Sequence, residues 1–372
     1  MKSTTGDHFI ALDHVRALAA FMVFVWHFIH GMNGTPVAFE YVPAFPTFSL
    51  LDEGHTGVSL FMTLSGYLFA RLLDGKEIHF GAFLWNRALR LLPLLLLVIL
   101  VRGCLTNSGW TEWKSYFQLI ASGLVEPVLP NGGWSITVEF HFYVMLPALL
   151  GILRLSKLRL LWVVAGMIGL RTVVWYTQGQ VQSLAHWTII GRMDQFVLGM
   201  VICQFRHFFD RRHGLAIGVM VFFSLFYGWF NHLGGLYRYL GYPSSGAWWI
   251  VLPTIEGLSY AMLIAWYERS FQFTTSGLSG WIGKIGEYSY SIYLLHFFIV
   301  FEAARFIHER LYSLSNFYVA TLSAGVVFLL MGPVGALSFR WIESPFLRLR
   351  KRYVIARTQS AEDSVGPGSL RS

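Results

Sequence analysis

Ten apolar stretches, each about twenty residues long, are separated by short polar segments along the chain. They cover residues 11–30, 55–73, 82–101, 133–153, 158–176, 186–205, 214–232, 247–267, 285–304 and 315–338. A helix needs about 20 apolar residues to span the hydrocarbon core of a bilayer, so each stretch predicts a transmembrane helix. We therefore expect an all-α fold, a polytopic membrane helical bundle with about ten transmembrane helices.

Basic residues are concentrated in every second loop between these stretches. The basic groups are Arg71, Lys76, Arg87 and Arg90, then Arg154, Lys157 and Arg159, then Arg206, Arg211 and Arg212, and finally Arg348, Arg350, Lys351 and Arg352. Cytoplasmic loops of membrane proteins carry such an excess of Lys and Arg, so both termini are predicted to be cytoplasmic. The chain then divides into a membrane domain, residues 1–348, and a tail, residues 349–372, that is basic at first and disordered afterwards.

The composition supports this class of protein. Of 372 residues, 55% are hydrophobic and only 13% are charged, and the mean hydropathy is +0.52, which excludes an ordinary soluble domain. The net charge of +8 is explained by the loops, and we expect no nucleic-acid partner. Cys104 and Cys203 lie on separate segments without metal-ligand or redox spacing, so no metal site is predicted.

The first apolar stretch is unusual because it contains Asp13, Arg16, His27 and His30. Arg16 and His27 are eleven positions apart, which on a helix places them within about 20° of one face. Asp13 lies one turn before Arg16, where opposite charges can pair. Ionised side chains inside a membrane usually face a protein interior or a wet cavity. His27 is therefore a candidate functional residue; the alternative is a neutral buried histidine with a hydrogen-bond partner.

The third stretch begins with two arginines one helical turn apart, Arg87 and Arg90. Their planar guanidinium groups can clamp phosphate groups through paired hydrogen bonds. The alternative is that topology alone explains them, since arginines at the inner end of a membrane helix are common.

The fourth stretch carries a polar stripe made by Ser135, Glu139 and Tyr143, which follow one another at spacings of four. Glu139 and His27 lie at the same predicted depth near the outer side. A Glu–His pair raises the basicity of the imidazole and fixes its tautomer. The alternative is that Glu139 is protonated and only ties helices together.

Other polar and small residues are expected to pack helices against one another. Tyr290 and Tyr293 in the ninth stretch carry hydroxyls of the kind that join membrane helices, while the role of the nearby His296 stays open. Ser65 and Gly66 in the second stretch are small residues that allow a close approach of two helices, and we interpret them as structural.

The order of six short stretches resembles that of the acyltransferase-3 family of integral membrane acyltransferases. The stretches are LDHVRALAAFMVFVWH, GVSLFMTLSGYLF, NRALRLLP, WSITVEFHFYVMLP, SYSIYLLH and FRWIESP. Each string alone is a weak signal, but six of them in the family's order are specific. The resemblance runs from about residue 10 to residue 348.

The motifs of that family fall on identifiable positions. A basic residue followed after ten positions by a histidine corresponds to Arg16 and His27, and the Arg-x-x-Arg pair associated with acyl-CoA binding corresponds to Arg87 and Arg90. Two further elements, Trp-Ser-x-x-x-Glu and Ser-Tyr-Ser-x-Tyr-x-x-His, supply the remaining matches: Trp134, Ser135, Glu139, Ser289, Tyr290, Ser291, Tyr293 and His296. Ser59 is a departure, since relatives often carry an acid there, so we give it no role.

The resemblance implies transfer of an acyl group, often acetyl, from cytoplasmic acyl-CoA to a hydroxyl group. The expected acceptor is a carbohydrate, such as an exopolysaccharide, O-antigen or oligosaccharide, or a small molecule. Acyl-CoA is the donor substrate, and no permanently bound cofactor is expected. We expect a multi-pass protein of a bacterial-type cytoplasmic (inner) membrane, with separate envelope-glycan assembly proteins as candidate partners besides the lipid bilayer.

On this hypothesis His27 and Glu139 are catalytic, with Glu139 orienting His27 as a general base. Arg16, Arg87 and Arg90 hold acyl-CoA. The remaining candidates hold the acceptor: Trp134, Ser135, Tyr293, His296 and Asp13. The alternative function is a polytopic transporter or flippase of an envelope glycan or small molecule, in which the same intramembrane charges gate a solute path.

Overall fold

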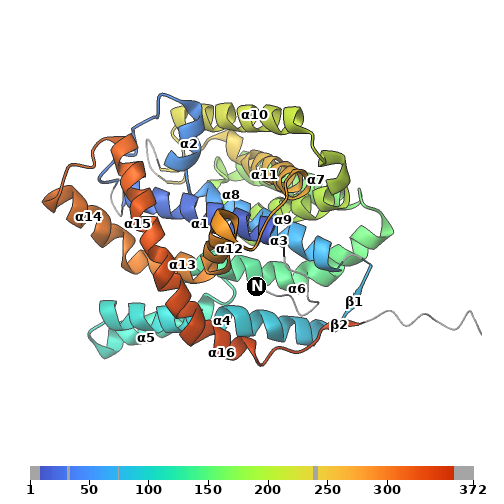
Figure 1. Ribbon diagram of the computed structural model, residues 1–372, viewed down its shortest axis with the longest axis horizontal. Coiled ribbons are helices and arrows are strands. Elements are labelled where there is room, and N and C mark those ends of the chain that lie inside the picture. The colour runs from blue at the N-terminus through green and yellow to red at the C-terminus, as the bar shows by residue number, and fades with distance from the viewer. Residues whose placement is uncertain (1–8, 32–33, 74, 238–241, 356–372) are drawn as a thin grey trace, which may run out of the picture.

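The structure is a computed structural model that describes residues 9–31, 34–73, 75–237 and 242–355. It is helical almost throughout (Figure 1). The first half contains α1 (Ile10–His30), α2 (Pro46–Asp52), α3 (Thr56–Leu73), β1 (Glu77–Ile78), α4 (Phe80–Thr106), α5 (Trp110–Ser122), α6 (Gly133–Leu155), α7 (Leu160–Gln178), α8 (Gln182–Trp187) and α9 (Ile189–Gln204). The second half contains η1 (Arg206–Phe209), α10 (His213–His232), η2 (Ala247–Ile250), α11 (Leu252–Ser270), α12 (Gly277–Glu287), α13 (Ser289–Leu295), η3 (His296–Phe298), α14 (Val300–Arg310), α15 (Phe317–Ser338), η4 (Phe339–Glu343), α16 (Ser344–Leu347) and β2 (Val354–Ile355).

The all-α class is confirmed, and so is a set of helices that can cross a membrane. Within the described residues, seven segments are long and apolar enough to do so: α1, α3, α4, α6, α7, α10 and Phe317–Leu347. An eighth is formed if α13 and α14, which meet at a bend of 54°, are taken as one span. All ten predicted stretches contain helix, but the count of ten spans and the cytoplasmic termini stay predictions.

The helix α9 shows that an apolar stretch does not by itself identify a membrane span. It has only 16 residues, and twelve of them are buried. It lies in the middle of the bundle with α1 and α3, whereas α10 runs along one edge and α4 and α5 along the opposite edge (Figure 1). A helix that is covered by protein on all sides is apolar because it belongs to a core, whether or not it spans the bilayer.

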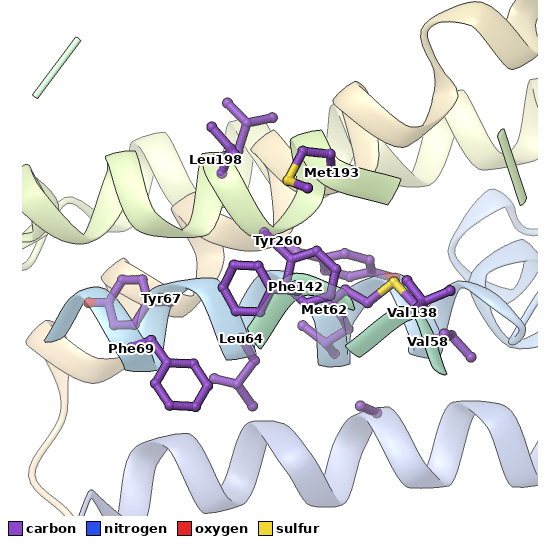
Figure 2. Packing of buried hydrophobic residues seen from close by; sticks show 14 of the residues in the cluster. Val58, Met62, Leu64, Tyr67, Phe69, Val138, Phe142, Met193, Leu198 and Tyr260 are labelled. Carbon is purple, nitrogen blue, oxygen red and sulfur yellow. The ribbon is translucent and has the colours of Figure 1, made fainter. Parts of the chain in front are cut away.

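Small residues bring α3 and α9 into close contact, as the sequence predicts for Gly66. A Cβ atom on Gly66 would lie 1.9 Å from the carbonyl oxygen of Phe196, and one on Gly199 would lie 2.1 Å from that of Thr63. Neither position can hold a side chain without separating the two helices. Figure 2 shows the apolar side chains around this contact, with Phe142 of α6 and Leu64 of α3 among them.

The end of the described chain folds back onto the start of α4. The strands β1 and β2 pair antiparallel, the backbone N–H of His79 donates to the carbonyl of Tyr353 at 2.8 Å, and the Asn86 amide donates to the carbonyl of Lys351 at 2.6 Å. Residues 349–355, the first part of the predicted tail, therefore pack against the membrane domain. The stretch predicted to be disordered, residues 358–372, lies outside the described residues.

Candidate functional site

A cavity of about 200 Å³ opens between α1, α3, α4, α6, α13 and the segment that contains Arg350 and Tyr353. Seven of the ten predicted site residues line it: Asp13, Arg16, Arg87, Arg90, Ser135, Glu139 and Tyr293. They come from four different helices that are far apart in sequence, so only the tertiary fold brings them together. His27, His296 and Trp134 do not belong to the lining that the structure describes.

Arginines gather at one end of this cavity. Arg87 lies over ring faces, with its guanidinium carbon 5.4 Å from the ring centre of Phe69 and 5.6 Å from that of Phe83. Arg90 pairs with Glu343, with Nη1 and Oε2 3.2 Å apart. The Nε atom of Arg87 is buried and has no hydrogen-bond partner among the described residues. This end therefore offers an unused N–H donor beside positive charge, which suits an anion.

Glu343 reaches Arg90 because the chain forms a short π-helix, η4, at Phe339–Glu343. Such widened turns shift the register of side chains and occur often at functional sites. The Glu343 carboxylate is buried and also accepts a hydrogen bond from the Ser291 hydroxyl. Glu343 was given no role from sequence, so this partner of Arg90 was missed.

A third arginine, Arg350, lies near the same end of the cavity and lines it. Burial, together with the positive charges of Arg90 and Arg87, lowers the pKa of Arg350 to about 10. The guanidinium still carries its proton at neutral pH. An anion that binds among these arginines reduces the repulsion between their like charges.

Asp13 and Arg16 form the ion pair that their spacing predicts, Nη1 of Arg16 with Oδ1 of Asp13. Both residues line the cavity, and the Arg16 side chain keeps 26% of its surface exposed. Arg16 is therefore open to a ligand on one side while Asp13 neutralises it on the other.

The predicted pair of Glu139 with His27 is wrong. Glu139 accepts hydrogen bonds from the Ser65 hydroxyl at 3.2 Å and from the Tyr143 hydroxyl. The sequence placed Glu139 and His27 at the same depth, but depth does not give the direction in which a side chain leaves its helix. Ser65, interpreted from sequence as a packing residue, also lines the cavity.

Ser135 and Tyr293 form the far end of the cavity. Their hydroxyl oxygens are 2.9 Å apart, and the Ser135 hydroxyl also donates to the carbonyl of Gly132 at 3.0 Å. Gly132 has φ 76° at the start of α6, a left-handed conformation that favours glycine. A Cβ atom there would also lie 3.0 Å from the Tyr293 ring. This glycine turn thus positions Ser135 against Tyr293.

His27 and His296 contact each other outside the cavity lining. His296 in turn contacts Tyr293, which lines the cavity. Nε2 of His296 lies 3.3 Å from Nδ1 of His27, and the ring of Tyr293 lies 5.9 Å from that of His296. Nδ1 of His27 donates to the carbonyl of Val23 at 2.8 Å, because a carbonyl only accepts. Nδ1 of His296 donates to the carbonyl of Tyr293 at 2.5 Å for the same reason.

These carbonyls fix the tautomers of both rings when they are neutral. His296 has its lone pair on Nε2, so the single Nδ1–H of His27 is shared between the Val23 carbonyl at 2.8 Å and His296 Nε2 at 3.3 Å. His27 then carries its own lone pair on Nε2. The partners that orient His27 are a backbone carbonyl and a second histidine, so the ring is held with its basic nitrogen pointing away from Val23.

Trp134 lies outside the cavity lining, in a cluster with Trp187 and His186. Its ring centre is 4.6 Å from that of Trp187 and 5.6 Å from that of His186. The guanidinium of Arg192 lies 6.0 Å from the Trp134 ring. Arg192 donates to the hydroxyl of Ser59 at 2.6 Å, which gives position 59 a hydrogen-bonding role in place of an acid.

The intramembrane charges whose partners the sequence did not name are paired with one another. Arg192 lies 3.6 Å from Glu256, and Asp194 pairs with Arg171 at 2.7 Å. Arg171 was not singled out from sequence, although an arginine in the middle of an apolar stretch is a usable signal. Both pairs are buried and lie outside the lining of the cavity.

The fold, with its long apolar helices around a buried polar centre, is that of a polytopic helical membrane protein. A family model described as an acyltransferase domain matches residues 9–341, nearly the whole chain. The chain therefore belongs to the acyltransferase-3 family.

A curated relative is consistent with this assignment. The acyltransferase MdmB from Streptomyces mycarofaciens is 28% identical over 352 residues, which cover 83% of this chain and 86% of the relative. No solved structure matches this chain.

Proposed function

We propose that this protein moves an acyl group, such as acetyl, from cytoplasmic acyl-CoA to a hydroxyl group of a carbohydrate acceptor. One observation carries the proposal. A single cavity is lined by Arg87, Arg90 and Arg350 at one end and by Tyr293 at the other, and Tyr293 is in contact with the pair His296 and His27.

The arginine end is suited to the phosphate groups of the donor. Arg87 has no carboxylate within ion-pair distance in the described chain, and Arg90 shares Glu343 with Ser291. A phosphate oxygen can accept a hydrogen bond from the unused Nε–H of Arg87, next to the positive charge of Arg90. The pantetheine arm then runs along the cavity past Glu139 and Ser135.

The histidine end supplies the base. His27 Nε2 takes the proton of the acceptor hydroxyl as its oxygen attacks the thioester carbonyl. A C–O bond forms, the C–S bond breaks, and the CoA thiolate takes up the proton from the His27 imidazolium, so the products are an ester and free CoA thiol. His296 accepts from His27 Nδ1–H and holds the ring through the transfer. General-base catalysis of this kind contributes roughly 10² to 10⁴ in rate.

A carbohydrate acceptor is supported by the rings around the histidines. Trp26 lies 4.7 Å from His27, and Trp134 and Trp187 form a pair nearby on α6 and α8. Flat indole faces with nearby hydrogen-bond donors bind molecules that are apolar on one face and polar at the edge.

The experiment uses the full chain in lipid nanodiscs with acetyl-CoA. Cells with and without the protein are first compared by mass spectrometry of envelope glycans and exported metabolites, which identifies the acylated product. The purified protein should then release CoA thiol only when the deacylated form of that product is present. His27→Ala should abolish this release, while His232→Ala, at an exposed histidine at the end of α10, should not change it.

Movement of the acceptor across the membrane without loss of thioester would contradict the proposal and support a transporter. Full activity of a folded His27→Ala protein would remove the histidine mechanism.

A further inference from the structure

Two buried histidines near the acceptor end take no part in the chemistry described above. His55 lies just before α3 with 5% of its surface exposed, and His186 lies in α8 with 3% exposed. Their ring centres are 5.3 Å apart. They come from loops and helices more than a hundred residues apart in sequence, so the fold alone makes them neighbours.

The tautomer of His186 is fixed by Arg192. Nη2 of Arg192 lies 2.9 Å from Nδ1 of His186, and Nε of the same arginine donates to the His186 carbonyl at 2.8 Å. An arginine has no acceptor and keeps its proton, so Nδ1 of His186 must present a lone pair. The ring proton is therefore on Nε2. This N–H has no acceptor in the part of the chain that the structure describes.

The tautomer of His55 is fixed by Glu53. Nε2 of His55 lies 3.0 Å from Oε2 of Glu53, and an ionised carboxylate only accepts, so the ring proton of His55 is on Nε2. Nδ1 of His55 then presents a lone pair. That atom is buried and has no hydrogen-bond partner among the described residues. A buried polar atom without a partner is costly, which points to a missing group.

We propose that His55 and His186 together bind one hydroxyl group of the acceptor that is not itself acylated. A hydroxyl is both donor and acceptor, so it can give its proton to Nδ1 of His55 and accept the N–H of His186 Nε2. Each of these bonds measures roughly 2.9 Å, so two rings whose centres are 5.3 Å apart are at a distance that one bridging oxygen can span.

This inference rests on the proposed function and narrows the class of acceptor. Trp26 separates the subsite from the base, with its ring 6.1 Å from His55 and 4.7 Å from His27. The hydroxyl held by His55 and His186 therefore differs from the hydroxyl that reacts. The acceptor must carry at least two hydroxyl groups, as carbohydrates do, and Trp134 and Trp187 lie beside His186 where a sugar ring can stack.

Substitution of His55 and His186 by Asn or by Gln distinguishes acceptor binding from a structural role. A Gln amide nitrogen reaches about as far as Nε2 of histidine, whereas an Asn amide reaches only as far as Nδ1. At position 186, Gln keeps the donor toward the acceptor, while Asn keeps only the partner of Arg192. At position 55 the order is reversed, because Asn keeps the acceptor at Nδ1 and Gln keeps only the bond to Glu53.

The test measures two quantities for the protein in nanodiscs, the KM of the acceptor and the KM of acetyl-CoA. The acceptor is the deacylated form of the product isolated from cells. We expect His186→Asn and His55→Gln to raise the acceptor KM about 10-fold, as expected for one lost hydrogen bond, with the KM of acetyl-CoA unchanged. His186→Gln and His55→Asn should stay within about 3-fold of the wild type, since each keeps the hydrogen bond to the acceptor. The reverse pattern at either position would overturn the proposal.

A second measurement does not depend on activity or on the acceptor. Nitrogen-15 NMR of histidine-labelled protein in nanodiscs reports which ring nitrogen carries the proton, and the signals of the two residues are assigned from His186→Gln and His55→Asn. Both neutral rings should be protonated on Nε2. A proton on Nδ1 of either residue would overturn the proposal, even if the protein is an acyltransferase. Failure of acyl transfer with both rings protonated on Nε2 would instead count against the proposed function.

Discussion

The two ends of the site hold polar groups in opposite ways. At the predicted inner end, Arg87, Arg90 and Arg350 bring positive charge together, with Glu343 as the ion-pair partner of Arg90. At the predicted outer end, His27 and His296 are oriented by backbone carbonyls and by each other. Arginine cannot lose its proton in a protein, whereas histidine can gain or lose one near neutral pH. Anion binding and proton transfer are thus assigned to different ends.

The largest expected effect is at the outer end. His27→Ala removes the only nitrogen that the mechanism uses as a base, so the rate of acyl transfer should fall by roughly 10² to 10⁴. The measurement is CoA release by protein of normal elution volume in nanodiscs. His232→Ala is the matched control, and a loss of rate in both variants would show that the effect is not specific to the site.

The second prediction distinguishes charged residues that stabilise the fold from charged residues that bind a ligand. Arg171 is fully buried and pairs with Asp194 through two hydrogen bonds, outside the cavity lining. Arg171→Met leaves the Asp194 carboxylate uncompensated, which should lower the free energy of unfolding by about 3 to 5 kcal/mol. Thermal unfolding in nanodiscs measures this loss. Arg305→Met, at an exposed pair with Glu302, should change it by less than about 1 kcal/mol.

The third prediction tests the inner end. Arg87→Ala removes a charge that contacts ring faces and leaves no buried carboxylate behind. We expect the KM of acetyl-CoA to rise about 10-fold or more, because a hydrogen bond to a charged group contributes about 1.5 to 3 kcal/mol. The acceptor KM should not change. Arg102→Ala, near the opposite end of α4, is the control, and equal effects on donor and acceptor would make Arg87 merely structural.

Arg90 should behave differently from Arg87 because it has an ion-pair partner. Arg90→Ala is expected to raise the KM of acetyl-CoA in the same way and, in addition, to destabilise the protein, since Glu343 loses its partner. The double variant with Glu343→Gln should recover stability without recovering donor affinity. Recovery of both would show that Arg90 does not touch the donor.

The smallest expected effect lies between the two ends. Tyr293→Phe removes one hydroxyl that is hydrogen-bonded to Ser135 and keeps the ring next to His296. A single hydrogen bond contributes about 0.5 to 1.5 kcal/mol, so the rate should fall by no more than about 10-fold. A loss as large as that of His27→Ala would mean that the Tyr293 hydroxyl takes part in proton transfer.

Features that depend on a residue's own type or on its near neighbours in the chain could be predicted from sequence. The ion pair of Asp13 with Arg16 follows from a spacing of three residues, and the capacity for a close helix contact at Gly66 follows from its missing side chain. The partners that residues meet on other helices could not be predicted. His27 meets His296, and Glu139 turns to Ser65 and Tyr143, although sequence placed Glu139 and His27 at one depth.

The sequence by itself determined that this protein is a helical membrane protein of the acyltransferase-3 family, because apolar length, basic loops and local motifs are properties of consecutive residues. Only the tertiary structure decided which polar residues share a cavity, which histidine tautomers are fixed, and that Arg90 pairs with Glu343. The physical reason is the rotation of each helix about its own axis. Spacing gives the face that residues share, but packing against other helices decides where that face points.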